Sequence, residues 1–259
     1  MNKLVIHPDF SPHSNLIINA IRDFDSEGVS VLNGDRNTIK SINIGDLNLN
    51  IKQFKTPYLF NAFVYRYFRK SKARRSYEYA NILTQKTILT PTPIGYFEET
   101  SPLGLKKSYY ISQHLEYDLD FRVLIHDLNY PNRVEILKQF TNFTFKLHEA
   151  NVNFLDHSPG NTLIVKSSSD HYDFYLIDLN RMHFEPMNLD KRMHNFRRLW
   201  LSKVMVNIMS KEYASLIAAN TSTKQLYDLM LYHSRNFQKK INKKKLRRSG
   251  RKMQFKPPN

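Results

Sequence analysis

The chain has 259 residues and a net charge of +16, from 39 basic and 23 acidic residues. Hydrophobic residues make up 41% of it, which is enough for a sizeable core and excludes a disordered chain. Cysteine is absent, so disulfide frameworks, thiolate zinc sites and cysteine nucleophiles are excluded. The positive charge indicates a polyanionic partner, which could be nucleic acid, an anionic membrane surface or a phosphorylated substrate.

The N-terminal sequence MNKLVIHPDF has no basic stretch followed by a long apolar run. No window of about 18 consecutive apolar residues occurs anywhere in the chain. We therefore expect neither a signal peptide nor a membrane-spanning helix, and a cytoplasmic protein that is soluble or peripheral at a membrane.

The first part of the chain predicts one short helix and three strands. The helix covers Leu16–Phe24, and the strands cover 29–34, 38–44 and 47–54, with turns at Gly34 and at Gly45–Asp46. The third strand alternates between an apolar face and a polar face. Its apolar face carries Leu47, Leu49 and Ile51, and its polar face carries Asn48, Asn50 and Lys52.

Residues 57–70 are aromatic and basic, and their pattern predicts no particular element. Ser71 is then the expected N-cap of a helix that runs to about Gln85, and the prolines that follow stop this helix. Two antiparallel strands are expected at 94–98 and 108–113, joined through the turn SPLGLKK.

From residue 118 the pattern becomes mostly helical. A helix is expected over Val134–Ala150, two short strands over 162–166 and 172–179, and further helices over 191–246. This α+β layout predicts an N-terminal lobe of residues 1–113, a C-terminal lobe of 114–234 and a basic tail of 235–259.

Three polar residues in the second half have the spacing of a phosphoryl-transfer site. Asp156 precedes Asn161 by five residues, and Asp178 follows Asn161 by seventeen residues at the end of a strand. A carboxylate can orient an attacking hydroxyl and accept its proton, while an amide oxygen and a second carboxylate can hold Mg²⁺ on the phosphates. In the strand-rich half, Lys52 could contact the phosphates, and Glu78 on the next helix could pair with it.

Each of these residues also has an ordinary structural interpretation. Asp156 and Asn161 are typical of a polar turn around a Pro-Gly pair. Lys52 could be a solvent-facing strand residue, with Lys55 as a rival candidate. Glu78 could pair with Arg74 or Arg75 on its own helix.

Two histidines lie close to the proposed site. His148, near the end of a helix, is interpreted as a packing or capping residue. For His157, inside the loop, substrate contact and a structural role stay equally open. The absence of cysteine and of clustered histidines makes a zinc site improbable.

Five segments, in this order between about residues 29 and 210, resemble the bacterial lipopolysaccharide kinase family, the Kdo and heptose inner-core sugar kinases. They are LNIKQFK, SKARRSYEYA, TPTPIGYFEE, LHEANVNFLDHSPGN and LIDLNRMHF. The resemblance implies a two-lobed protein-kinase-like fold. Its N-lobe would be a small antiparallel sheet with one main helix, and its C-lobe mostly helical. It also implies that ATP and Mg²⁺ are the cofactors.

The resemblance assigns a role to each matching residue. Asp156 matches the catalytic aspartate, Asn161 and Asp178 match the metal ligands, Lys52 matches the phosphate-binding lysine and Glu78 its helix partner. The linker between the lobes, whose backbone would hold adenine, matches Gln113, His114, Leu115 and Glu116.

The sequence departs from protein kinases in several places. Asp178-Leu179-Asn180 replaces the Asp-Phe-Gly triplet, and Phe154 stands where a histidine is usual before the catalytic aspartate. The turn NGDRNTI has one glycine instead of three, and no Ala-Pro-Glu-type segment follows. The changes after Asp178 and the missing Ala-Pro-Glu-type segment favour a small-molecule or sugar acceptor over a protein. The resemblance implies that the acceptor is a sugar hydroxyl of the lipopolysaccharide inner core or of its lipid-linked precursor. The alternatives are a protein or small-metabolite kinase, and a non-catalytic scaffold that binds polyanions.

Residues 235–256 contain eleven Lys and Arg residues and no acidic residue. This segment could be a solvated tail, a contact for anionic lipid at about 1 kcal/mol per basic residue, or a nucleic-acid contact. No sequence signature of a nucleic-acid-binding domain accompanies it. We expect it to bind the inner face of the cytoplasmic membrane, and we expect no nucleic-acid partner.

Overall fold

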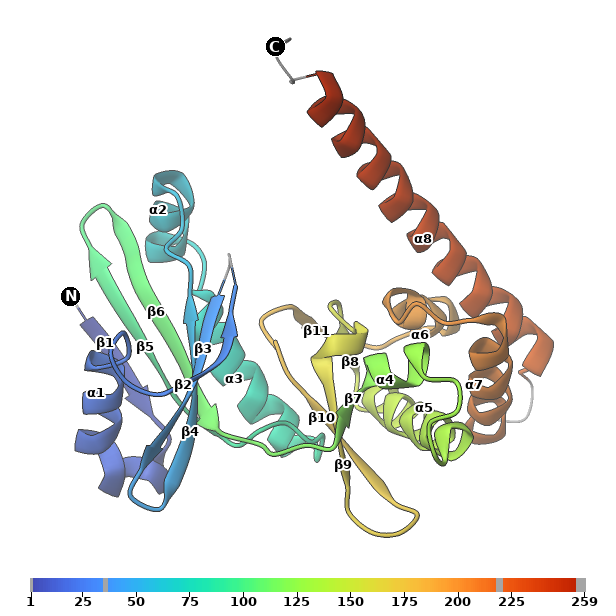
Figure 1. The fold of residues 1–259 in the computed structure, drawn as a ribbon, viewed down its shortest axis with the longest axis horizontal. Coiled ribbons are helices and arrows are strands. Elements are labelled where there is room, and N and C mark those ends of the chain that lie inside the picture. The colour runs from blue at the N-terminus through green and yellow to red at the C-terminus, as the bar shows by residue number, and fades with distance from the viewer. Residues whose placement is uncertain (1, 35–36, 218–220, 255–259) are drawn as a thin grey trace. The chain divides into compact units, whose positions relative to one another are not determined.

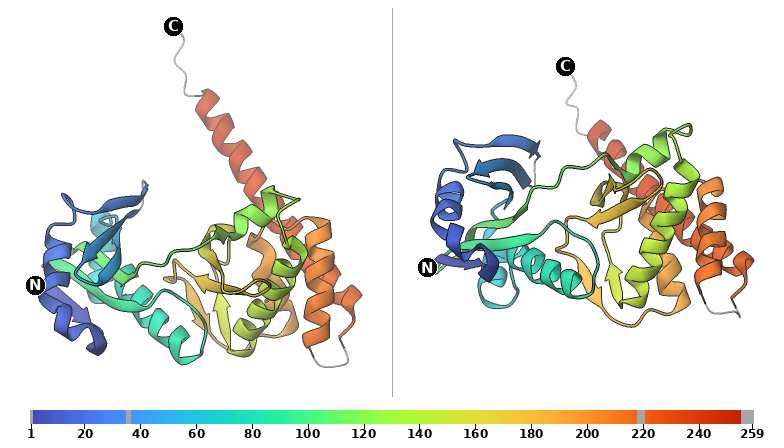
Figure 2. Two further views of the ribbon diagram at one scale, coloured as in Figure 1. Left: turned by 60° about the horizontal axis from the view of Figure 1, so that its bottom comes forward. Right: turned by 90° about the horizontal axis from the view of Figure 1, so that it is seen from below.

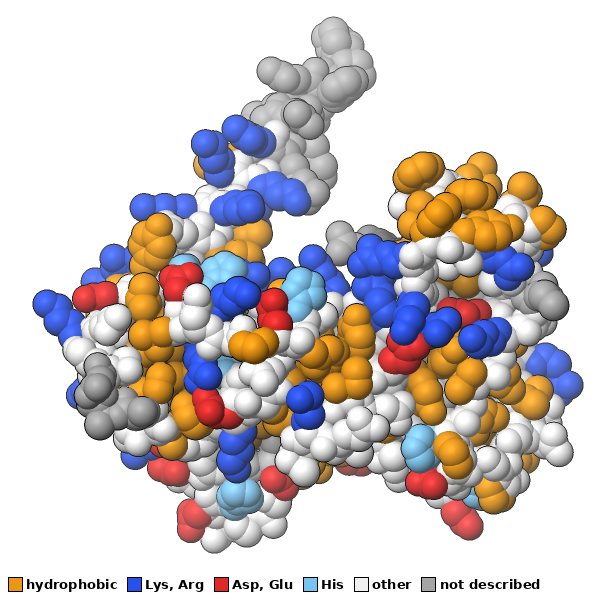
Figure 3. Space-filling model, turned by 180° about the vertical axis from the view of Figure 1, so that it is seen from behind, with side chains coloured by type: hydrophobic (Ala, Val, Ile, Leu, Met, Phe, Trp, Pro, Cys, Tyr) orange, Lys and Arg blue, Asp and Glu red, His pale blue; other side chains and the backbone are white. Residues whose placement is uncertain are grey.

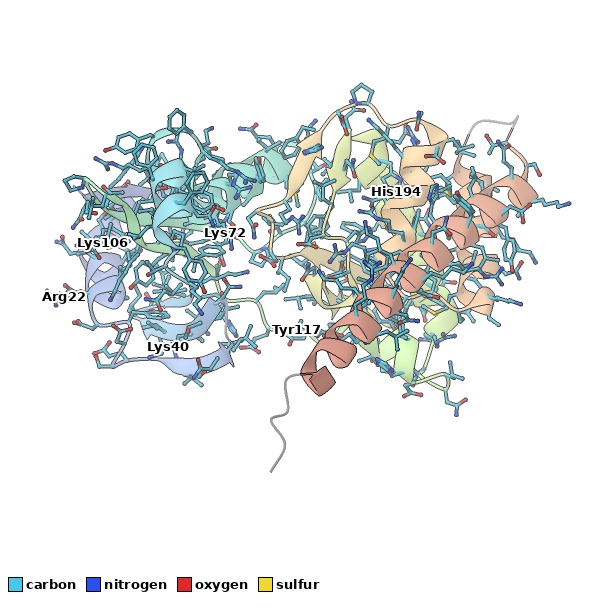
Figure 4. All side chains as sticks on the ribbon, turned by 90° about the horizontal axis from the view of Figure 1, so that it is seen from above. Arg22, Lys40, Lys72, Lys106, Tyr117 and His194 are labelled. Atoms are coloured by element: carbon cyan, nitrogen blue, oxygen red, sulfur yellow. The ribbon has the colours of Figure 1, made fainter. Side chains whose placement is uncertain are left out.

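The structure is a computed structural model that describes residues 2–34, 37–217 and 221–254. Its contacts divide the chain into two compact units. Unit 1 comprises Met1–Tyr117 and Tyr175–Arg181, and unit 2 comprises Asp118–Phe174 and Met182–Asn259. The break after Tyr117, a residue labelled in Figure 4, lies near the expected lobe boundary, whereas the membership of 175–181 in unit 1 was not expected.

Unit 1 is built on a six-stranded sheet with the order β1-β5-β6-β4-β3-β2 (Figure 1). Its strands are β1 (Asn2–Ile6), β2 (Val29–Asn33), β3 (Asn37–Ile44), β4 (Leu47–Phe54), β5 (Pro93–Ser101) and β6 (Gly104–Gln113). The helices are the 3₁₀ turn η1 (Pro8–His13), α1 (Ser14–Arg22), α2 (Leu59–Tyr67) and α3 (Lys72–Gln85). All strand pairs with a described register are antiparallel. The sequence patterns left β1 and α2 without an assignment.

The two faces of this sheet are covered by different helices (Figure 2). On one face α1 packs against the apolar side of the sheet, where Leu49 and Ile51 of β4 are fully buried. On the other face α3 packs through Ala73 against Phe54 of β4. Side chains alternate along a strand, so Lys52 lies on the face of α3, as the alternation predicted.

The chain enters α3 through the predicted cap. The buried Ser71 hydroxyl accepts a hydrogen bond from the Arg74 amide at 3.0 Å, which satisfies one of the unpaired donors of the first turn. The helix ends at Gln85, and Thr87 follows it in the left-handed region with φ of 56°. The predicted helix over 71–85 is therefore confirmed.

Unit 2 packs helices around small sheets. Its helices are α4 (Phe121–His126), α5 (Arg133–Glu149), α6 (Leu189–Asn195), α7 (Lys203–Leu216), α8 (Thr223–Gln254) and the 3₁₀ turns η2 (Pro159–Asn161) and η3 (Phe196–Arg198). The strands are β7 (Leu119–Asp120), β8 (Val152–Phe154), β9 (Thr162–Lys166), β10 (Tyr172–Leu176) and β11 (Met182–Phe184). The last two residues of β10 are counted with unit 1. Phe140 of α5 and Tyr213 of α7 lie at the centre of its core.

The expected basic tail is part of a helix. The first half of α8 is anchored in the core of unit 2 through the fully buried Leu226 and Met230. The expected boundary between residues 234 and 235 falls inside this helix, and residues 255–259 lie outside the described part of the chain. All Lys and Arg side chains from Arg235 to Arg247 are exposed. Within the described residues, no helix combines the length and apolar character needed to cross a bilayer.

Candidate active site

Lys52 and Asp178, both in unit 1, form an ion pair. Lys52 Nζ lies 2.7 Å from Asp178 Oδ1, and the lysine side chain is only 11% exposed. The Asn180 side-chain amide donates to the same oxygen at 2.7 Å. The residue expected to bind phosphate and one of those expected to bind metal are therefore direct neighbours, although 126 positions separate them.

Glu78 does not pair with Lys52, which corrects the expected partner. Its carboxylate instead binds Lys70 at 2.8 Å and Arg74 at 2.9 Å. Burial alone would raise the pKa of Glu78, but the hydrogen bonds from Lys70 and Arg74 hold it below the usual range. Arg74 and Glu78 are one turn apart on α3, so the local pair is geometrically favoured over one that crosses to the sheet.

Arg75 is a residue of this site that sequence reasoning missed. It is buried on α3, and its guanidinium donates to the backbone carbonyl of Asn180 at 2.8 Å. Burial lowers its pKa from the usual value, and the nearby positive charge of Arg69 acts in the same direction. Arg75 thus holds the backbone just after Asp178, which itself has a positive φ of 57°. The sequence signal for its role was weak: Arg75 is a charged residue on the side of α3 that otherwise carries small or apolar residues such as Ala73 and Ala80.

The segment Tyr175–Arg181 is held to unit 1 by further hydrogen bonds. The Leu176 amide donates to the Leu89 carbonyl at 3.0 Å, and the Thr90 hydroxyl donates to the Leu176 carbonyl at 2.8 Å. Together with Arg75, these bonds explain why Asp178 belongs to the unit that carries Lys52.

The expected adenine linker begins with residues that are tied to the sheet. The Gln113 amide donates to Thr92 at 2.9 Å, and the His114 amide donates to Asn48 at 2.7 Å. The His114 ring lies 3.3 Å from the carboxylate of Glu116. These two amides are therefore engaged within unit 1 itself.

In unit 2, Asp156 and Asn161 are brought together by the loop that follows β8. The Asn161 side-chain nitrogen donates to the Asp156 carbonyl at 2.8 Å, which leaves the amide oxygen of Asn161 as the group that can bind a cation. The spacing of five residues therefore corresponds to one polar turn, and the catalytic role of Asp156 and the metal-binding role of Asn161 stay predictions.

Arg198 is the second residue that sequence reasoning missed. Its guanidinium lies 2.9 Å from Asp156 Oδ1, and the aspartate side chain is 15% exposed. The same guanidinium lies over the ring of Phe237 on α8, 5.4 Å from its centroid. Arg198 comes from η3, which follows β8 by about 40 residues, so no local motif pointed to it.

His148 and His157 are structural residues of unit 2. Both are fully buried, and the side-chain oxygen of Asn195 contacts both rings, at 2.9 Å from His157 and 3.4 Å from His148. Burial lowers the pKa of His148 to about 3 and that of His157 to about 4, so both are neutral near pH 7. The structural interpretation therefore holds for His157 as well as for His148.

Each unit offers a donor that suits a hard cation. Asp178 of unit 1 carries a carboxylate, and Asn161 of unit 2 carries an amide oxygen, which are ligand types that Mg²⁺ prefers. Across the described ranges 2–34, 37–217 and 221–254, no three His, Asp or Glu side chains gather as a metal site. The turn expected to cover the phosphates includes residues 35–36, which lie outside these ranges.

An antiparallel sheet unit with a strand lysine, joined to a helical unit with an Asp–Asn loop, defines a protein-kinase-like phosphotransferase. The model of the lipopolysaccharide kinase (Kdo/WaaP) family matches residues 35–220, so the chain belongs to this family and is a lipopolysaccharide kinase. A search of curated proteins gives no match. The resemblance and the enzyme class expected from the sequence are both confirmed.

Among solved structures, the chain is similar to one described as "WaaP in complex with acyl carrier protein". The two share 16% sequence identity at a TM-score of 0.63, and the match covers 92% of this chain and 98% of the other. This similarity confirms the predicted fold class.

Proposed function

We propose that this lipopolysaccharide kinase transfers the terminal phosphate of ATP to a sugar hydroxyl of the inner core, on Kdo or heptose, or of its lipid-linked precursor. The proposal rests on the ion pair between Lys52 and Asp178, which is partly buried. A kinase needs a cation for the nucleotide phosphates next to a carboxylate for the metal.

Each unit supplies part of what phosphoryl transfer requires. In unit 1, Lys52 would bind the nucleotide phosphates, and Arg75 holds the backbone that carries Asp178. In unit 2, Asp156 would orient the sugar hydroxyl and accept its proton, and Arg198 positions its carboxylate. The carboxylate of Asp178 in unit 1 and the amide oxygen of Asn161 in unit 2 would each serve as a ligand for Mg²⁺, whose charge would neutralise the phosphate oxygens.

Residues at the end of the linker would bind adenine. Because the amides of Gln113 and His114 already donate to the sheet, backbone groups of Leu115 and Glu116 are the better candidates for the adenine edge. A Leu115→Pro substitution removes one backbone donor, so it should weaken nucleotide binding in an equilibrium titration.

We also propose that the exposed basic half of α8 draws the enzyme to the anionic inner face of the cytoplasmic membrane, where its acceptor is held. Seven Lys and Arg side chains between Arg235 and Arg247 are exposed there, without an acidic residue. Such a cluster attracts anionic headgroups by about 1 kcal/mol per residue near the surface. Replacing Lys243, Lys244 and Lys245 by Gln should weaken vesicle binding mainly at low salt.

The test of the catalytic roles is transfer of labelled phosphate from ATP to purified lipopolysaccharide. Asp156→Asn should lower turnover by about 100-fold or more, since general-base catalysis alone contributes that much. Asp178→Asn should lower turnover by about 100-fold or more as well, because it weakens a ligand of the Mg²⁺ that stabilises the phosphate charge. Asp228→Asn, at an exposed position on α8, is the matched control and should keep full activity. Near-normal turnover in either site variant, with folding intact, would refute the assignment.

The same assay identifies the acceptor. Mass spectrometry of the product after mild acid cleavage should place one added phosphate on Kdo or on heptose. Phosphate that appears only on a protein, or on a small metabolite in the absence of lipopolysaccharide, would favour the alternative acceptors.

A further inference from the structure

Helix α2 of unit 1 is attached to the sheet through a small residue and turns its large apolar side chains outward. Ala62 is its one buried residue. Ala62 packs on Gly104, where an added Cβ would lie only 2.6 Å from the Ala62 backbone. The contact between Ala62 and Gly104 is therefore a close approach of two backbones.

Six large side chains in and beside α2 form a surface that we call the aromatic cap. Its members are Tyr58, Leu59, Phe60, Phe63, Tyr67 and Phe68. Their exposed fractions run from 47% for Phe63 to 83% for Tyr58, with Phe60 at 79%. Figure 3 shows hydrophobic side chains gathered over α2 at one end of unit 1.

Three rings of the aromatic cap lie close together. The ring of Phe63 lies 4.8 Å from that of Tyr67 and 6.0 Å from that of Phe68, measured between centroids. The Tyr67 hydroxyl donates to the Pro102 carbonyl in the turn between β5 and β6, where Leu103 is 74% exposed. Scattered exposed apolar residues are ordinary, but a contiguous group of this kind marks an interaction surface.

Basic residues border the aromatic cap. Residues 55–77, which contain the cap, include seven Lys and Arg residues and no Asp or Glu. Arg75 is buried, and Glu78, the next residue after this segment, binds Lys70 and Arg74, so six basic side chains at the surface or partly exposed face one carboxylate. In Figure 3 Lys and Arg side chains lie directly beside the hydrophobic group.

A pocket of about 250 Å³ lies at the base of α2. Its lining includes Lys55, Tyr58, Tyr65 and Lys72, of which Lys72 is labelled in Figure 4. Ammonium groups beside tyrosine rings suit a phosphate group at the edge of an apolar phase. The pocket therefore extends the basic border under the aromatic cap.

We propose that the aromatic cap inserts into the interfacial layer of a bilayer that contains anionic phospholipid, with the basic border at the headgroups. Exposed aromatic rings beside Lys and Arg match the two zones of such an interface. The excess of basic over acidic side chains in 55–78, seven to one, matches its charge. This surface is distinct from the basic half of α8, and the inference holds whichever sugar is phosphorylated.

The first experiment is co-sedimentation of the full chain with vesicles of phosphatidylethanolamine and phosphatidylglycerol. The double variant Phe60→Ser/Phe68→Ser should bind about tenfold more weakly or worse, because two rings no longer enter the interface. Leu128→Ser, which changes a side chain of unit 2 that is 70% exposed, is the control and should bind as the parent does. Equal binding of the double variant and the parent would overturn the proposal.

The second experiment reports where the aromatic cap lies. In a Trp200→Phe background, which removes the native tryptophan, Phe60→Trp should be quenched by phospholipids with brominated acyl chains, whereas Leu128→Trp should not. The quenching should persist at high salt, which screens the attraction of the basic residues but not apolar insertion. An unquenched Trp at position 60 in bound protein would overturn the proposal and point to a protein partner. Neither vesicle binding nor quenching depends on phosphate transfer. A failure of the membrane-insertion proposal can therefore be distinguished from a failure of the proposed kinase function.

Discussion

Acidification should destabilise the folded chain through the two buried histidines of unit 2. His148 and His157 have no exposed surface, and each contacts the side-chain oxygen of Asn195. Burial lowers the pKa of His148 to about 3 and that of His157 to about 4. The positive charges of Arg192, near His148, and of Arg197, near His157, act in the same direction.

The sign follows from comparing the two states. In the unfolded chain a histidine titrates near about 6.5, so it takes up a proton as the pH falls below that value, while the folded chain does not. The contribution to stability is thus fully present above about pH 6.5 and is lost as the pH falls towards the folded pKa values. Between about pH 7 and about pH 5 each histidine should lower the free energy of unfolding by about 2 kcal/mol, and the pair should lower it by about 4 kcal/mol.

The assay is urea unfolding at these two pH values. In His157→Gln the loss of unfolding free energy on acidification should be smaller than in the parent by about 2 kcal/mol, because one titrating group is gone. Carboxylates titrate in both proteins and cancel in this comparison. His126→Gln, at an exposed position, is the control. If His157→Gln and the parent lose the same free energy between the two pH values, the reasoning is refuted.

Three further substitutions test the packing around the site. Arg75→Met should raise the Mg²⁺ concentration needed for half-maximal turnover by about 10- to 100-fold, because the backbone at Asn180 loses its anchor. An unchanged Mg²⁺ titration would contradict this. Gly104→Ala should destabilise unit 1 by about 2 kcal/mol or more, since its Cβ would meet the backbone of Ala62, and an unchanged urea midpoint would contradict the close contact. Ser71→Ala should cost about 1 kcal/mol for the lost cap, measured in the same way.

Elements whose pattern is local were predictable from the sequence. The alternation along β4 placed Lys52 on the face opposite Leu49 and Ile51, and the Ser71 cap marked the start of α3. Both signals depend only on neighbouring residues. Strand β1 could not be found this way, because it pairs with β5, which lies about 90 residues later in the chain. Helix α2 was missed because its outward-facing apolar residues do not show the usual buried stripe.

The candidate site also has a part that the sequence predicted and a part that it did not. Asp156 and Asn161 are five residues apart, so a single turn brings them together and their spacing was informative. The partner of Lys52 was not predicted, because the sequence suggested Glu78 for this role and Asp178 only as a metal ligand. The choice depends on the segment Tyr175–Arg181, which hydrogen bonds from Leu176, Thr90 and Arg75 attach to unit 1.

The sequence by itself determined the chemistry of this enzyme: the side-chain types, their order along the chain, and the family to which they belong. Tertiary structure alone decided that Lys52 pairs with Asp178, that Arg198 contacts Asp156, and that the aromatic residues of α2 face solvent. The physical reason is the range of the interactions. Caps, turns and strand faces follow from residues a few positions apart, whereas ion pairs and packing between distant segments form only when the whole chain has folded.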